Sequence, residues 1–152
     1  MHIRPASTAD RDAILALVPR LAEHGTPPGR DRERISAVDT ETIAAVIDLR
    51  SPEVEVLVAE DGDGLLGFVH VRTVTDYYTQ APIGHVSDLV VAEKTEGRGV
   101  GRALIEAAQS WARDRGYRMM QLYVLPENTG ARALYERMGY RGEWIKYVTP
   151  LS

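Results

Sequence analysis

Apolar positions near the start of the chain recur first at strand-like and then at helical spacing. Ile3 to Ala6 form a short edge-like segment. Ser7 and Asp10 follow it, and both residue types are favoured at helix N-termini. The positions that then recur at helical spacing are Ile14, Leu15, Val18, Leu21 and Ala22. This pattern predicts an amphipathic helix, which Pro19 should bend or weaken.

A polar segment separates this helix from the next. Gly25 to Arg34 contains only polar and turn-forming residues apart from its prolines, which predicts a mobile loop. A second helix is predicted to begin at Asp39 or Thr40. It should end before Pro52, because proline disfavours helical conformation in the residue that precedes it. Its inward-facing positions are Ile43, Val46 and Ile47.

The apolar period changes to two at Val54, which predicts strands. Val54, Val56 and Val58 share one face of the first of these strands. The Asp-Gly-Asp-Gly turn at 61–64 should reverse the chain into a strand from Leu65 to Thr75, giving an antiparallel hairpin. Another strand is expected from Gly84 to Val91.

The last third of the chain alternates between the two patterns. An apolar stripe of Val100, Leu104, Ala107, Ala108 and Trp111 predicts a helix that ends near Gly116. A strand from Arg118 to Val124, a helix from Thr129 to Met138 and a strand from Trp144 to Val148 follow. This order predicts an α/β fold with a central mixed β-sheet and helices on both faces. With no repeat visible, residues 1–152 are interpreted as a single domain.

Composition and charge narrow the classes of function. The 152 residues are 44% hydrophobic and 26% charged, as in ordinary globular domains, and the formal net charge is −4. The net negative charge argues against a non-specific nucleic-acid binder. The absence of cysteine excludes disulfides, thiolate metal sites and a cysteinyl acyl-enzyme. The four histidines lack metal-ligand spacing, so no metal is expected. No signal-like or membrane-spanning run is found, so a cytoplasmic location is the default.

Three glycines in five residues, 97–101, stand between a predicted strand and the apolar-striped helix. Such a backbone approaches ligands closely, and the N-H groups and dipole of the helix favour an anion. Arg102 follows Gly101 where a Walker loop requires lysine. Leu104 stands where a dinucleotide fingerprint requires Gly or Ala. Both nucleotide motifs therefore fail, and the alternatives are another phosphate-bearing ligand or a simple turn.

Two blocks resemble the GNAT family of N-acetyltransferases. Leu89 to Val91 and then residues 96–104, Glu-Gly-Arg-Gly-Val-Gly-Arg-Ala-Leu, are similar to the family's Arg/Gln-x-x-Gly-x-Gly/Ala acetyl-CoA signature after an apolar strand. Residues 128–140, Asn-x-x-Ala-x-x-Leu-Tyr-x-x-x-Gly-Tyr, resemble the next family helix. The resemblance covers about residues 84 to 141 and implies a GNAT-like fold. One departure is Glu96 in place of Arg or Gln, which we expect to weaken rather than abolish cofactor binding.

The resemblance implies transfer of an acetyl group from acetyl-CoA to a primary amine by direct attack in a ternary complex. The alternative is a non-catalytic coenzyme A sensor or scaffold of the same fold. The implied cofactor-binding residues are Leu89, Val90, Val91, Arg98, Gly99, Val100, Gly101, Arg102, Ala103, Asn128, Ala131 and Tyr135. A plain structural role remains open for two of them, because Asn128 suits a helix N-cap and Tyr135 lies on an inward helix face.

Acyl transfer also requires proton acceptors and donors. An amine of pKa about 10 is only about one part in a thousand deprotonated at pH 7, so a base is useful. Asp88 matches an acidic position of the family, within a Gly84-to-Asp88 segment that resembles the glucosamine-phosphate acetyltransferase branch, where Ser87 replaces the usual Glu. His85 is the rival base. Tyr135 matches the family tyrosine that faces the sulfur, and the N-H of Val90 or a neighbour would stabilise the oxyanion.

The acceptor is not fixed by the sequence. Gly25 to Ala37 and the Asp76-to-Pro82 loop, with Tyr77 and Tyr78, should wall its site. Their mixture of arginines, acidic residues and tyrosines suits anionic, aromatic or cationic amines, so a small-molecule amine and a peptide amine both stay open. Exposed edge strands are compatible with a homodimer.

Overall fold

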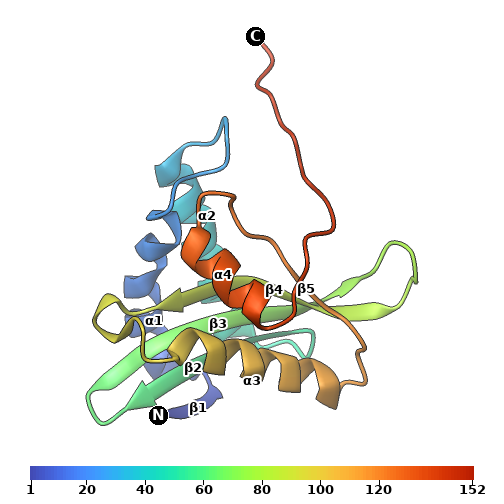
Figure 1. Ribbon diagram of the computed structural model, residues 1–152. Helices are drawn as coiled ribbons and strands as arrows, with labels where there is room; N and C mark the ends of the chain where they lie inside the picture. The colour runs from blue at the N-terminus through green and yellow to red at the C-terminus, as the bar shows by residue number, and fades with distance from the viewer.

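A five-stranded sheet with helices on both faces forms the body of the protein (Figure 1). The computed structural model describes residues 1–152. The strands, in their order across the sheet, are β1 (His2–Pro5), β2 (Val54–Asp61), β3 (Gly64–Thr75), β4 (Pro82–Val91) and β5 (Met120–Leu122). The first four strands pair antiparallel, whereas β5 pairs with β4 in parallel. The predicted mixed sheet is therefore confirmed.

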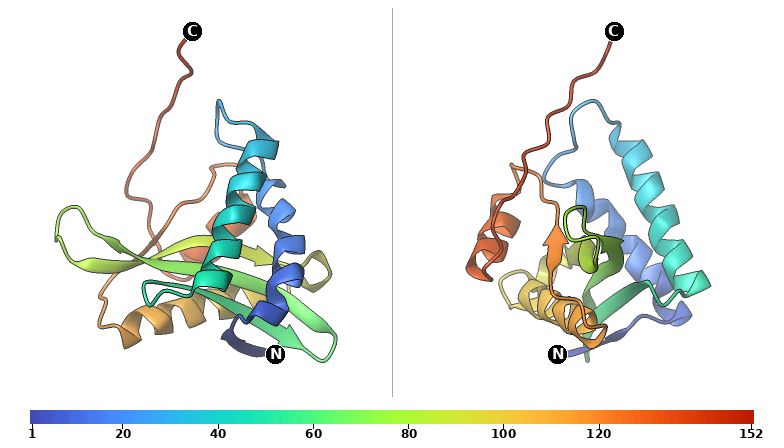
Figure 2. Two further views of the ribbon diagram at one scale, coloured as in Figure 1. Left: turned by 180° about the vertical axis from the view of Figure 1, so that it is seen from behind. Right: turned by 90° about the vertical axis from the view of Figure 1, so that its right-hand side faces the viewer.

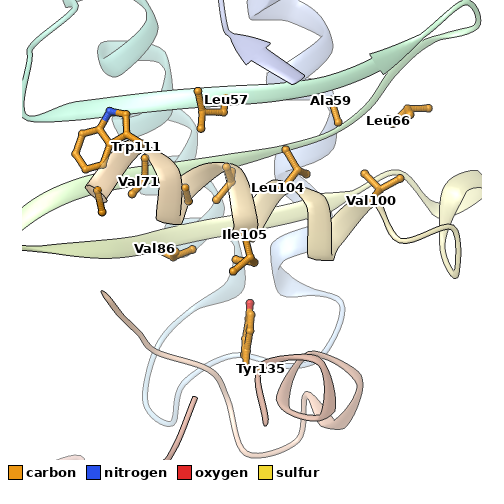
Figure 3. Packing of buried hydrophobic residues seen from close by; sticks show 13 residues of the cluster. Leu57, Ala59, Leu66, Val71, Val86, Val100, Leu104, Ile105, Trp111 and Tyr135 are labelled. Carbon is orange, nitrogen blue, oxygen red and sulfur yellow. The ribbon is translucent and has the colours of Figure 1, made fainter. Parts of the chain in front are cut away.

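Each face of the sheet has its own apolar core. On one face lie α1 (Arg11–Leu17) and α2 (Arg32–Leu49), and on the other lie α3 (Val100–Asp114) and α4 (Thr129–Arg137) (Figure 2). Val56 and Val58 of β2 pack under α1 and α2. Leu57 and Ala59 pack on the opposite side with the apolar stripe of α3 (Figure 3). The period-two pattern of β2 thus supplies two cores, because successive side chains point to opposite faces.

The helices differ from the sequence prediction mainly at one N-terminus. α2 begins at Arg32, so the prediction of a start at Asp39 or Thr40 is wrong and the polar connection is shorter than Gly25 to Arg34. Asp31 caps the helix by accepting a hydrogen bond from the Arg34 N-H at 3.0 Å. The helix begins with three charged residues, Arg32 to Arg34, so no apolar period marked its start. None of the helices combines the length and the apolar character needed to span a membrane.

Pro19 has the predicted effect on the first helix. α1 ends at Leu17, and the chain continues as a 3₁₀ helix from Val18 to Ala22 with the proline in its first turn. Proline lacks the N-H that an α-helical turn would use, so the tighter turn takes over at this point.

Near the C-terminus one predicted strand is shorter than expected and another is absent. β5 spans only Met120–Leu122 of the strand predicted from Arg118 to Val124. No strand forms from Trp144 to Val148, and this segment runs away from the body of the protein (Figure 1) with most of its large side chains exposed. The composition of the segment is typical of strands, but strand propensity acts only where a partner strand offers backbone and packing surface.

Candidate active site

β4 separates from the edge strand β5 part-way along its length. Pairing between them covers three residue pairs and ends at Val86–Leu122. Directly after it, β4 bulges against β3, because His70 faces Asp88 while Val71 faces Val86, which leaves Ser87 without a partner. Bulges often lie beside functional sites, where they redirect a strand. The C-terminal half of β4 consequently has a free edge.

The backbone groups on this free edge can be assigned. The Ala92 N-H donates to the Leu66 carbonyl at 2.8 Å, on the β3 side. Since backbone groups alternate along a strand, Leu89 and Val91 turn their N-H and C=O groups away from β3, into the gap that β5 leaves. Unpaired strand groups of this kind bind extended ligands by adding hydrogen bonds to the edge.

Arg20, in the 3₁₀ helix after α1, closes one end of this edge. Its Nε donates to the Val91 carbonyl at 2.8 Å, and its Nη2 pairs with Glu96. Glu23 and Glu93 also lie within 4.0 Å of its Nη1. The guanidinium is thus surrounded by three carboxylates at the start of the glycine loop. This pairing changes the expectation for Glu96, whose charge is compensated by a residue far away in the sequence.

The glycine loop leads from β4 into α3. Gly97 and Gly99 have φ values of 77° and 78°, in the left-handed region that glycine adopts without strain. The Ala103 N-H donates to the Gly99 carbonyl at 3.1 Å. The N-H groups of the three helical residues before it, Val100, Gly101 and Arg102, precede the first intrahelical bond and have no acceptor within the helix. An anion at this helix N-terminus would receive them.

The side chains predicted to contact the cofactor take several roles. Val90 and Val100 are buried in the two cores, so only their backbones can serve a ligand. Arg98 pairs with Asp61 at 3.4 Å, and Arg102 pairs with Glu106 at 2.9 Å. Leu89 and Val91 lie beside Gly101, and a Cβ added there would be 3.6 Å from Val91 Cγ2 and 3.9 Å from Leu89 Cδ2. The structure therefore brings the strand edge and the loop together.

Tyr135 is carried by α4 on the same side of the sheet as α3. Its side chain is 8% exposed and belongs to the cluster that contains Val86 and Ile105, and its hydroxyl points toward Ile105 (Figure 3). Burial, with a smaller effect of Tyr140, raises the pKa of Tyr135 to about 12. The phenol is therefore protonated at neutral pH. Asn128 caps α4 by accepting a hydrogen bond from the Ala131 N-H at 3.2 Å, as its N-cap propensity predicts.

The two candidate bases lie on the α1 and α2 side of the sheet. Asp88 Oδ2 lies 2.8 Å from Nδ1 of His70, its partner across the β3–β4 pairing. His85 instead contacts Gln121 of β5 through Nδ1 at 2.9 Å. Burial, aided by the charge of Arg72, lowers the pKa of His85 to about 4. His85 is thus weakly basic, whereas the carboxylate of Asp88 has a histidine that orients it.

Asp39 was not singled out from the sequence. It lies on the inward face of α2, one turn before the buried Ile43, and is itself partly buried. Burial and, secondly, the negative charge of Asp88 raise the pKa of Asp39 to about 6. Its proximity to Asp88 and His70 depends on the packing of α2 over the sheet, which no local sequence pattern reports.

Of the two segments predicted to wall the acceptor site, one is a loop and the other is a loop only in part. Tyr77 and Tyr78 lie in the β3–β4 connection and are strongly exposed. Of the segment from Gly25 to Ala37, the part from Arg32 onward belongs to α2. No group of three or more histidine and acidic side chains has a metal-binding arrangement.

Comparison with known proteins places these features in one family. The model of the acetyltransferase (GNAT) family matches residues 19–140. Mycothiol acetyltransferase of Beutenbergia cavernae is 43% identical over 84 residues, which cover 55% of this chain but only 27% of that protein. Aminoglycoside N(6')-acetyltransferase type 1 of Stenotrophomonas maltophilia is 35% identical over 85 residues, 54% of this chain and 55% of its own length.

A solved structure shows the same fold over the full chain. Ribosomal-protein-alanine N-acetyltransferase from Brucella melitensis superimposes with a TM-score of 0.73 at 20% identity, covering 99% of this chain and 100% of its own. At this identity the likeness concerns the fold alone. The names of the three proteins refer to three different acceptors.

Proposed function

This chain belongs to the acetyltransferase (GNAT) family, and we propose that it transfers an acetyl group from acetyl-CoA to a primary amine by direct attack in a ternary complex. The observation that carries this proposal is the gap between β4 and β5. It lies between a free strand edge and a glycine loop at a helix N-terminus, which together suit an extended ligand that ends in phosphates.

Different parts of coenzyme A would bind at different points along the gap between β4 and β5. The free N-H groups of Val100, Gly101 and Arg102 would receive the pyrophosphate of coenzyme A at the start of α3. The outward backbone groups of Leu89 and Val91 would hold its pantetheine arm. Arg20 already occupies the Val91 carbonyl, so the N-H groups and the Leu89 carbonyl remain for the ligand.

Acetyl-CoA supplies an acetyl thioester, whose carbonyl carbon bonds to the amine nitrogen as its C–S bond breaks. Asp88 accepts the proton that the amine nitrogen loses, and His70 Nδ1 holds the carboxylate in place from the neighbouring strand. The Leu89 N-H, rather than that of Val90, turns into the gap and can donate a hydrogen bond to the oxygen on which negative charge develops.

Tyr135 would complete the proton balance by donating its phenolic proton to the departing sulfur. Because burial keeps the pKa of Tyr135 near 12, the proton is present at every pH where the amine reacts. The tyrosine lies in the same cluster as Val86, the residue at which β4 and β5 cease to pair. Tyr135 would therefore donate its proton at the end of the gap where β4 and β5 separate.

Calorimetric titration with acetyl-CoA, followed by a thiol-release assay with a panel of amines, tests the proposal. Binding with amine-dependent thiol release supports a transferase. Binding without release from any amine would favour a coenzyme A sensor. Absence of binding would refute the assignment of the glycine loop. Asp88→Asn should retain cofactor binding while lowering kcat by about a hundredfold.

A further inference from the structure

Three polar side chains on the α1 and α2 side of the sheet form no ion pair with lysine or arginine. Asp39 forms no ion pair and no side-chain hydrogen bond, and Asp88 contacts only His70. These residues come from α2, β4 and β3. Asp88 and His70 both act electrostatically on Asp39, and Arg72 of β3 is exposed and lies opposite His85. The cluster therefore contains two carboxylates with no lysine or arginine paired to them.

His70 adds an unpaired buried nitrogen to the cluster. Its side chain is 3% exposed, yet its Nε2 has no hydrogen-bond partner, whereas buried polar atoms are almost always paired. When Nδ1 donates to the Asp88 carboxylate, Nε2 is left as an acceptor. His70 projects from the same face of β3 as Phe68, which packs under α1 and α2. Nε2, the ring nitrogen farther from the backbone, is thus directed toward the helix layer that carries Asp39.

One chemical group can complement all of the free hydrogen-bond acceptors in this cluster. Asp39 offers a carboxylate, Asp88 offers the oxygen that His70 does not bind, and His70 offers Nε2. An ammonium group has three N-H donors, no acceptor and a positive charge. A phosphate or carboxylate on the acceptor would instead meet two carboxylates at close range.

We infer that this cluster selects an acceptor with at least two ammonium groups, an aliphatic diamine or polyamine. One amine reacts beside Asp88, while Asp39 holds a second, protonated amine. The inference rests on the proposed acetyl transfer and specifies its substrate class. Asp39 is then a specificity residue, and its exposure on the inward side of α2 leaves the carboxylate within reach of a ligand.

Matched acceptors test the inference. Diamines of three to six carbons are compared with ω-amino acids of equal chain length, in which a carboxylate replaces the second ammonium group. Wild-type protein should acetylate the diamines with at least about tenfold higher kcat/KM. Equal rates for the two series, or a preference for the amino acids, would overturn the inference while leaving acetyl transfer itself established.

The variant Asp39→Asn should reduce the preference for diamines about tenfold, mainly through KM, with coenzyme A affinity unchanged. Glu41→Gln is the matched control, because Glu41 lies on the same helix but is exposed, and it should keep the preference. An unchanged preference in Asp39→Asn would refute the role of Asp39. If no amine is acetylated, calorimetric titration of a diamine into coenzyme A-loaded protein tests acceptor binding separately. Equal affinity of wild type and Asp39→Asn for the diamine would refute the proposed role of the cluster.

Discussion

Removing the Arg20 guanidinium should expose the glycine loop to the carboxylates that now surround it. Arg20 is 17% exposed and binds both the Val91 carbonyl and Glu96, whereas Glu96 is 60% exposed. In Arg20→Met, the apolar part of the side chain is kept but Glu96 loses its partner. The carboxylate would then repel the phosphates of coenzyme A. Glu96→Gln alone removes the same charge while Arg20 stays in place.

The expected changes in stability and in coenzyme A affinity follow from how exposed the Arg20 and Glu96 side chains are. An ion pair with one well-exposed partner stabilises a fold by about 0–1 kcal/mol, so the pair contributes little to folding. An uncompensated charge near the phosphates is worth about 1 kcal/mol at moderate ionic strength, and the lost Val91 bond adds a similar amount. We therefore expect Arg20→Met to weaken coenzyme A binding about tenfold or more. The double variant Arg20→Met with Glu96→Gln should recover a few-fold of this loss.

Calorimetry at two salt concentrations measures this cycle. The defect of Arg20→Met should shrink as salt rises, because screening weakens the repulsion. Arg11→Met is the control for a lost surface pair, since Arg11 pairs with Asp48 at 3.2 Å and neither residue belongs to the loop. If the double variant binds no better than Arg20→Met, the repulsion by Glu96 is not the cause, and the reasoning fails.

Four further outcomes are expected. Tyr135→Phe should lower kcat about a hundredfold at unchanged coenzyme A affinity; an unchanged kcat would exclude it as the proton donor. His85→Gln should keep activity at pH 7.5 within about threefold. The fold lowers the pKa of His85 from 6.5 to about 4, so the wild type should lose about 2 kcal/mol of stability as the pH falls from 6.5 to 4. His85→Gln should not show this loss, and parallel pH–stability curves of the two proteins would contradict the expectation. The raised pKa of Asp39 means that the fold disfavours its charged form. Asp39→Asn should therefore increase the free energy of unfolding by about 1 kcal/mol above pH 6, allowing for exposure, and leave it unchanged below pH 4. Chemical denaturation measures this, and a loss of stability would contradict it. Gly99→Ala should weaken coenzyme A binding about tenfold because of its positive φ, whereas Gly101→Ala should bind normally; equal affinities would remove the strain argument.

Local patterns predicted most of the fold. The apolar stripe of α3 and the alternation of β2 are properties of neighbouring residues, and both elements formed as expected. The start of α2 depends instead on one side-chain cap at Asp31. The strand expected from Trp144 to Val148 required a partner strand, which propensity alone cannot supply.

The candidate site likewise contains some residues that local sequence patterns indicate and others that only the fold brings together. The glycine loop and Tyr135 could be proposed from the sequence because their residues stand close together in two recognisable blocks. His70 was missed because its pairing with Asp88 follows from a register that shifts at the Ser87 bulge. Arg20 meets Glu96 across 76 positions of sequence, and Asp39 meets Asp88 only through helix packing. A single sequence contains no signal for such distant contacts.

The two apolar clusters share no residue, although β2, β3 and β4 contribute to both. The residues proposed to choose the acceptor, His70, Asp88 and Asp39, stand on one side of the sheet, while the glycine loop and Tyr135 belong to the other. A substitution that reshapes α2 therefore need not repack the layer that receives coenzyme A.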